Sequence, residues 1–262
     1  MKPGTLLQIE TRTIQSTVKC VAEDLCLMER QQTFPVPTST IDVFATWFLA
    51  FADLAPGQLR IRTGSGLIDF SEKFNGPIAI FLPAFTLIEW NLAPGTIHWS
   101  AMCSPKPLPN DAPRVPMIFN SPGKTPRTTK EVADCLARAE NPVTFQSERY
   151  SSSTAMRTKA YIDGNFKEDL KIQSVGAALR ISWGVMSREF NAVYGLSPVA
   201  YRNKLRIMEA VRRIYLGENL TTALLEVGFS TQGRFIEQFR SQLGVNPSHY
   251  KASRAIRPRS DS

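Results

Sequence analysis

The sequence has few of the residues that hold metal ions or cross-link a secreted domain. Its 262 residues include two histidines, His98 and His249, which lie in different halves of the chain. Neither half can therefore supply the three histidines of a zinc site or the two histidines of a non-haem iron site. The four cysteines are irregularly spaced, which argues against a disulfide framework and against a paired-cysteine zinc site. We expect reduced thiols in a cytoplasmic protein, with no metal ion and no cofactor.

Long apolar runs are also missing. The richest apolar stretch, residues 43–55, contains Asp53 and is too short to span a bilayer. The first residues lack the apolar core of a signal peptide, so we expect neither a secretory segment nor a membrane span. The hydrophobic share of 43% and the charged share of 21% are typical of a globular protein. The length fits one large domain or two ordinary ones.

Charge and proline divide the chain into two unlike parts. Residues 1–150 hold 14 Lys and Arg against 14 Asp and Glu, whereas residues 151–262 hold 17 against 9. The whole net charge of +8 therefore lies in the second part, while 15 of the 18 prolines lie in the first. A basic part beside a neutral one favours a polyanion such as nucleic acid as a partner, although a mild basic excess also serves solubility.

The first part is expected to be mainly β. Short strands are predicted over residues 41–103, where residues 59–62 alternate with period two and residues 78–81 and 85–90 are short apolar runs between Gly, Asn and Pro turns. Strands at this spacing predict a small sandwich or barrel. One amphipathic helix is predicted over residues 128–140, and it packs either on its own domain or against a second copy of the chain.

The basic part has the pattern of several short, sharply bounded helices. A helix, a tight turn and a second helix occur over residues 174–195 and again over residues 221–244. In the first pair, Ser182 is a start signal for the second helix and Gly195 is its stop signal. Two such pairs are typical of a protein with two helix-turn-helix motifs, whose second helices each present one face to DNA.

Helical periodicity separates the buried face of each second helix from its exposed face. Met186 and Phe190 in the first motif, and Phe235 and Phe239 in the second, are four residues apart and point inward. The opposite faces carry the residues that we predict to contact DNA, which are Gly184, Ser187, Arg188 and Asn191 in the first motif and Thr231, Gln232, Gly233, Arg234 and Glu237 in the second.

The second motif also carries a recognisable signature. Residues 226–232 read EVGFSTQ, and Phe235, Phe239, the GVNP stretch at 244–247 and Tyr250 follow in register. Upstream matches occur at Ser182, Arg188, Phe190, Gly195, Pro198, Tyr201 and Arg206. Over residues 157–252 the chain resembles the AraC/XylS family of bacterial transcription regulators.

The resemblance implies an α+β chain in which a mainly β, cupin-like barrel domain precedes an all-α domain with two helix-turn-helix motifs. We accordingly expect a sensor or dimerisation domain at 1–145, a linker at 146–156, an AraC-type DNA-binding domain at 157–254 and a tail at 255–262. Such a protein would bind promoter DNA in the bacterial cytoplasm, as part of the nucleoid. It would usually activate transcription by contact with RNA polymerase, often as a homodimer and under the control of a small molecule.

Four positions depart from the family pattern. Gly176 and Leu224 stand where the first helix of each motif usually has alanine, and Gly176 costs about 1 kcal/mol of helix propensity. Arg180 occupies a turn position that is usually glycine or a small polar residue. Glu237 stands where many members have a DNA-contacting arginine. The fold follows despite these departures, but base contacts do not transfer residue by residue.

Several residues have two open roles. His98 is either a structural residue or a ligand to a metal or effector. Eight aromatic residues either belong to the core or line an apolar effector pocket, namely Phe44, Trp47, Phe48, Phe51, Phe81, Phe85, Trp90 and Trp99. Five cationic residues either contact phosphate, pair with the other domain or face solvent, namely Arg202, Lys204, Arg206, Arg212 and Arg213.

Two other functions compete with a ligand-controlled regulator. One is an enzyme, either a cupin-type oxygenase or a DNA-repair alkyl acceptor, fused to the DNA-binding part. The histidine count disfavours the oxygenase and the cysteine spacing disfavours the alkyl acceptor. The other is a DNA-binding regulator whose first domain docks a partner protein instead of a small molecule, and the sequence leaves this alternative open.

Overall fold

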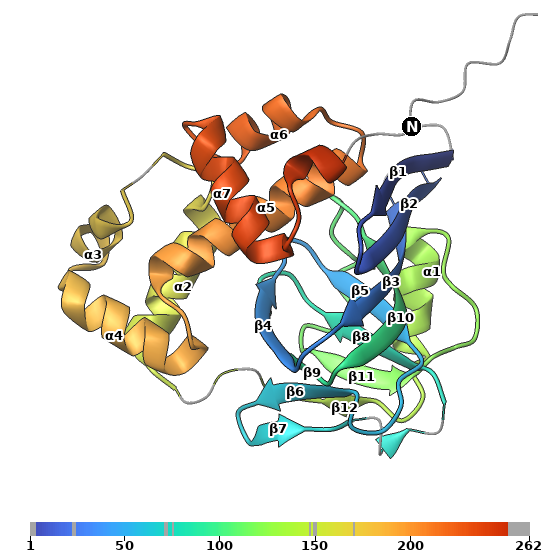
Figure 1. Cartoon of the computed structure of the whole chain (residues 1–262). Helices are drawn as coiled ribbons and strands as arrows, with labels where there is room; N and C mark the ends of the chain where they lie inside the picture. Colours follow the sequence, from blue (N-terminus) through green and yellow to red (C-terminus); the bar gives the residue numbers. More distant parts are fainter. Residues whose placement is uncertain are drawn as a thin grey trace, which may run out of the picture.

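The computed structural model of the chain (Figure 1) describes residues 4–22, 25–70, 73–74, 76–146, 148, 151–169 and 171–250. In the described chain, the regular elements up to residue 144 are strands and one helix, and those from residue 153 onward are helices. This arrangement confirms the predicted α+β fold class. The expected tail, residues 255–262, lies outside the described residues.

Two antiparallel sheets face each other in the first part. The large sheet has the order β1-β2-β3-β10-β5-β8-β11-β12 and the small sheet the order β4-β9-β6-β7. The large sheet contains β1 (Gly4–Glu10), β2 (Ile14–Ala22), β3 (Leu25–Phe34), β10 (Gly95–Cys103), β5 (Phe48–Ala52), β8 (Ile78–Leu82), β11 (Met117–Asn120) and β12 (Val143–Thr144). The small sheet contains β4 (Thr38–Val43), β9 (Leu87–Leu92), β6 (Leu59–Thr63) and β7 (Gly66–Ile68). Residues of both inner faces join one buried apolar cluster, so the expected barrel takes the form of two packed sheets.

One helix, α1 (Thr129–Ala137), covers the outer face of the large sheet. The Thr128 side chain accepts a hydrogen bond from the backbone N–H of Glu131 at 3.1 Å and caps the helix as expected. Val132 and Leu136 are buried in a cluster with residues of β5, β8 and β11. The apolar stripe of α1 is therefore used within its own domain.

The second part is helical. It contains α2 (Ser153–Asn165), α3 (Gln173–Leu179), α4 (Trp183–Tyr194), α5 (Pro198–Tyr215), α6 (Leu220–Glu226), α7 (Gln232–Leu243) and the 3-10 helix η2 (Pro247–His249). The side chain of Ser182 caps α4, and Gly195 ends it with a φ of 74°. The helix α2 begins at Ser153, so the last residues of the expected linker 146–156 are helical, because Ser152 accepts from the backbone N–H of Ala155 at 3.2 Å.

The two parts pack against each other, with α5 lying beside the sandwich (Figure 1). Near the end of α5, the Tyr215 hydroxyl donates to the sulfur of Met28 at 3.3 Å, and the Tyr215 carbonyl accepts from the Cys26 thiol at 3.5 Å. At the other side of the helical part, the ring of Phe85 meets the ring of Phe166 edge-on at 6.4 Å. The β part is thus contacted by the last residue of α5 and by the residue that follows α2.

Candidate nucleic-acid interface and interdomain cavity

The first helix-turn-helix motif, α3 and α4, closes on its own backbone. Arg180 ends α3 in the left-handed conformation with a φ of 56°, and the Ile181 N–H donates to the Gly176 carbonyl at 2.8 Å. A Cβ atom at position 176 would lie 2.7 Å from the carbonyl oxygen of Ile181. The glycine that departs from the family pattern therefore suits this particular turn, in which an alanine would require the backbone at Ile181 to shift.

The turn of the second motif, α6 and α7, has a comparable backbone bond, from the Phe229 N–H to the Leu224 carbonyl at 3.2 Å, and also packs against another segment of the helical part. Gly228 has a φ of 82°, and a Cβ atom there would overlap the backbone carbonyl of Lys167, in the segment between α2 and α3. Ala223 and Leu224 are both buried in the first helix of this motif. The departure at Leu224 thus leaves the packing of α6 intact.

The predicted DNA-contacting residues lie on the solvent face of the two recognition helices α4 and α7. Eight of the nine are exposed and Ser187 is half-buried. Met186, Phe190, Phe235 and Phe239 are fully buried on the opposite faces, which confirms the inward side of each helix. Contact of these residues with DNA remains a prediction.

The exposed charges of the two recognition helices are weakly engaged in the free chain. The Arg188 guanidinium lies 3.7 Å from the Glu189 carboxylate, and 71% of its side-chain surface is exposed. No hydrogen bond or ion pair joins Arg234 to Glu237, both of which the structure describes. Glu237 is therefore free to meet another group.

Arg206 of α5 is a structural residue. Its guanidinium donates to three backbone carbonyls, those of Phe166 at 2.6 Å, Glu168 at 2.7 Å and Gly228 at 2.8 Å. Burial, together with the like charge of Arg202, lowers the pKa of Arg206 to about 10, so the side chain stays charged at neutral pH. It connects α5 to the end of α2 and to the turn of the second motif, so of the roles left open for this residue the structure supports neither a solvent face nor pairing with the other domain, and it gives no support to phosphate contact.

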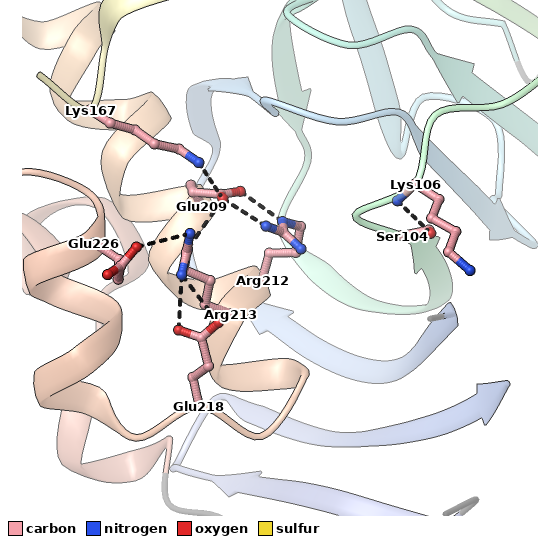
Figure 2. A network of polar contacts seen from close by, with 8 residues as sticks. All are labelled: Ser104, Lys106, Lys167, Glu209, Arg212, Arg213, Glu218 and Glu226. Atoms are coloured by element: carbon pink, nitrogen blue, oxygen red, sulfur yellow. Dashed lines mark hydrogen bonds and ion pairs between the residues drawn. The ribbon is translucent and has the colours of Figure 1, made fainter. Parts of the chain in front are cut away.

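A buried carboxylate organises the neighbouring turn of α5 (Figure 2). Glu209, which is 3% exposed, accepts from Arg212 Nε at 2.7 Å and Nη2 at 2.6 Å, from Lys167 at 3.1 Å and from Arg213 at 3.4 Å. Burial alone would raise the pKa of Glu209, but the hydrogen bonds and charges of Arg212 and Lys167 outweigh it and lower the pKa.

Arg213 extends this network to the second motif. Its guanidinium donates to Glu218 at 3.1 Å and lies 3.5 Å from Glu226 at the end of α6 (Figure 2). Arg212 and Arg213 therefore pair within the helical part. Lys204 instead interacts with a charge of the β part. Burial lowers its pKa overall, and the charge of Asp42 on β4 offsets part of that effect.

A cavity of about 250 Å³ lies inside the sandwich and opens onto the helical part. Four of the eight predicted aromatic residues line it, namely Phe44, Phe48, Trp90 and Trp99. The other four belong elsewhere, because Trp47, Phe51 and Phe81 pack on the outer face beneath α1 and Phe85 packs on Phe166. Their apolar character can be read from the sequence, whereas the face of the sheet that each residue occupies depends on strand register.

One wall of the cavity is α5 itself. Met208, Glu209, Arg212 and Tyr215 line it together with strand residues such as Arg30. The Arg30 guanidinium lies 5.4 Å from the centre of the Trp99 ring. The cavity thus combines an aromatic, apolar body with charged groups at the helix that carries both motifs.

His98 is exposed on β10 and does not line the cavity. Among the described residues, no group of three or more His, Cys, Asp or Glu side chains is arranged to hold a metal ion. None of the helices in the described residues has the length and apolar character needed to cross a membrane.

The helical part is similar to domains of known proteins. Residues 175–253 match the family described as "Helix-turn-helix domain". The chain is 24% identical over 99 residues to the virulence regulon transcriptional activator VirF of Yersinia enterocolitica, covering 37% of this chain and 36% of that protein. It is 27% identical over 88 residues to the transcriptional activator RhaS of Pectobacterium carotovorum, covering 33% and 32%. The chain thus spans about a third of the length of these relatives.

Among solved structures, ToxT from Vibrio cholerae is similar with a TM-score of 0.47 and 11% identity, covering 91% of this chain and 98% of that one.

Proposed function

We propose, from the premise that residues 175–253 form an AraC-type helix-turn-helix domain, that the chain is a sequence-specific DNA-binding regulator of transcription. One observation carries the proposal. A single helix, α5, joins two complete helix-turn-helix motifs, and the first turns of α4 and α7 are both free in solvent. The N-terminal end of a recognition helix is the part that meets base edges in the major groove.

The electrostatics support the same function. The net charge of +8 lies wholly in residues 151–262, and Arg188 and Arg234 point into solvent from the two recognition helices. Positive charge on the face of a DNA-binding domain neutralises phosphates and releases their counterions. Promoter activation, contact with RNA polymerase and a homodimer remain predictions, as does the division into domains at residues 146–156.

We further propose that a small, largely apolar molecule in the cavity controls DNA binding. Such a ligand would touch α5 directly at Met208 and Tyr215, so its binding energy would depend on the position of the helix that joins the two motifs. Control by a docked protein is the second candidate, and no surface feature of the described residues favours it.

The DNA-binding proposal is tested by selecting duplexes from a random pool with the full chain. Enrichment of one sequence is expected, and affinity for it should fall steeply with salt. Arg188→Ala should cost about 1–3 kcal/mol on the selected duplex and much less on random DNA. Lys130→Ala on α1, far from the motifs, is the control. Failure to enrich any duplex would overturn the proposal.

The effector proposal is tested by thermal shift against a metabolite library. A true ligand should raise the melting temperature of the wild-type chain and lose this effect in Ala101→Phe, because Ala101 lines the cavity. Stabilisation that persists in Ala101→Phe would place binding elsewhere. No stabilising compound, together with a protein captured specifically by the β part from lysate, would favour the docking alternative.

A further inference from the structure

The two recognition helices differ at their tips. Trp183 and Val185, in the first turn of α4, are each 37% exposed, although both are large apolar residues. In α7 the large apolar residues are buried or half-buried, and its first exposed positions are Gln232, Gly233 and Arg234. Two neighbouring apolar side chains are therefore exposed at the tip, that is the first turn, of α4, and none is exposed at the tip of α7.

The position of these two residues matters more than their exposure. They flank Gly184, where a Cβ atom would have no neighbour within 4 Å, so the backbone there is open to close approach. The tip of a recognition helix is the part that enters the major groove. In that groove the C5-methyl of thymine is the one apolar group on a base edge, and apolar side chains distinguish thymine by contact with it.

The charges around the tip suit DNA better than an apolar partner. Arg180 precedes the tip and Arg188 follows it on the exposed side of α4. Arg157 reaches the same corner, where it donates to the Leu179 carbonyl at 3.1 Å. This arrangement suits DNA, because apolar side chains at the tip can contact base edges in the major groove while the surrounding arginines contact the phosphates on either side of it.

We propose that Trp183 and Val185 read thymine methyl groups, so that the first motif selects thymine by apolar contact while the second motif reads bases through hydrogen bonds. The inference rests on the proposed DNA-binding function and adds the chemistry of the half-site. It also adds two residues to the four that periodicity assigned to α4.

The test uses the duplex selected from the random pool, with each thymine replaced in turn by uracil, which lacks only the methyl group. The half-site of α4 is the one whose base preference relaxes in Arg188→Ala. The wild-type chain should lose about fourfold in affinity for each contacted methyl removed from that half-site, the effect of burying one such group. Uracil in the other half-site should have little effect.

Variants assign the effect to the two residues. Val185→Ala and Trp183→Ala should bind thymine and uracil duplexes equally at the position that each residue contacts. Val185→Thr keeps one methyl group and should retain part of the preference, which guards against loss of folding in the other variants. Leu225→Ala removes an exposed apolar side chain from α6, outside the recognition helices, and should keep the full preference.

The outcomes separate the two proposals. A wild-type chain that binds a selected duplex but tolerates uracil throughout the α4 half-site overturns the inference and leaves DNA binding intact. The same holds if both alanine variants keep the preference. If no duplex is enriched, the proposed function and the inference fail together.

Discussion

The two helix-turn-helix motifs have the same architecture but are held together differently. Each turn is spanned by an equivalent backbone hydrogen bond, from the Ile181 N–H to the Gly176 carbonyl in the first motif and from the Phe229 N–H to the Leu224 carbonyl in the second. The second turn is also held by other elements, because Gly228 packs on the carbonyl of Lys167 and its own carbonyl accepts a hydrogen bond from Arg206 of α5. The turn of the second motif is thus tied to α5 and to the segment after α2, whereas the first motif packs mainly on α2, from which Arg157 donates to the Leu179 carbonyl.

This difference gives α5 a second role beyond spacing the motifs. On one side it forms a wall of the cavity through Glu209 and Arg212, and on the other it holds the second motif through Arg206 and Arg213. Because α5 packs more extensively on α6 and α7 than on α4, we expect a change at the cavity to affect the second motif more than the first. Substitutions at the two turns and in the ion-pair network of α5 test this difference.

Gly228→Ala should be the most damaging change. It forces alanine into a left-handed conformation and places a Cβ on the Lys167 carbonyl, so we expect a loss of more than about 3 kcal/mol in the free energy of unfolding, measured by chemical denaturation. Gly244→Ala is the matched control, because Gly244 also has a positive φ of 70° but open space around it, and should cost about 1 kcal/mol. Equal losses at the two positions would show that the contact with Lys167 is unimportant.

Glu209→Gln should cost about 3 kcal/mol, because it leaves Arg212 with no carboxylate in a buried setting. The pKa of Glu209 is lowered in the folded chain, so its stabilisation is complete above its ordinary pKa of 4.5 and is lost as the pH falls below that value. Denaturation at pH 7 and pH 4 should therefore show a difference between wild type and variant that shrinks at the lower pH.

The control for Glu209 lies in the same network. Glu218→Gln removes a more exposed partner of Arg213, whose side chain is 35% exposed, and should cost less than about 1 kcal/mol. Equal destabilisation by Glu218→Gln and Glu209→Gln would contradict the central role of Glu209 in this network.

Sequence reasoning succeeded where local chemistry determines structure. Ser182 and Gly195 bound α4 as predicted, and Phe235 and Phe239 mark the buried face of α7. It failed where partners are distant in the chain. The strand assignment began at residue 41 and missed β1 to β3, although the alternating burial of β2 was available as a signal in its sequence.

The candidate site shows the same limit. Exposure of the predicted DNA-contacting residues followed from helical period, but the three carbonyls around Arg206 come from residues 22 to 40 positions away and leave no periodic trace. Trp183 was missed because apolar residues in a helix are assigned to the core by default. Only its place in the first turn, where the helix has no preceding turn to cover it, could have indicated exposure.

Gly176→Ala should have a smaller effect than Gly228→Ala. The Cβ would lie 2.7 Å from the Ile181 oxygen, while the φ of Gly176 is an ordinary helical one and alanine gains helix propensity. We expect a net loss of about 1 kcal/mol in the free energy of unfolding. Gly184→Ala, with open space around it, is the control and should be neutral or stabilising. A stabilising Gly176→Ala would show that the first turn relaxes easily and that its closure is not set by this glycine.

The smallest effect is expected at Glu237, on the solvent face of α7. The three-residue spacing of Arg234 and Glu237 would allow a bond along the helix surface, but no hydrogen bond or ion pair joins these two described residues, so that role has no support. An unengaged carboxylate in the groove can accept a hydrogen bond from the N4 amino group of cytosine, and it is repelled by phosphates. Glu237→Gln should therefore reduce the preference for cytosine at one position of the selected duplex by about 1 kcal/mol, measured by competition against thymine at that position, and raise affinity for random DNA slightly. If the variant keeps the preference for cytosine and binds random DNA more tightly, then Glu237 only repels phosphates. The second motif would in that case read its bases without this carboxylate.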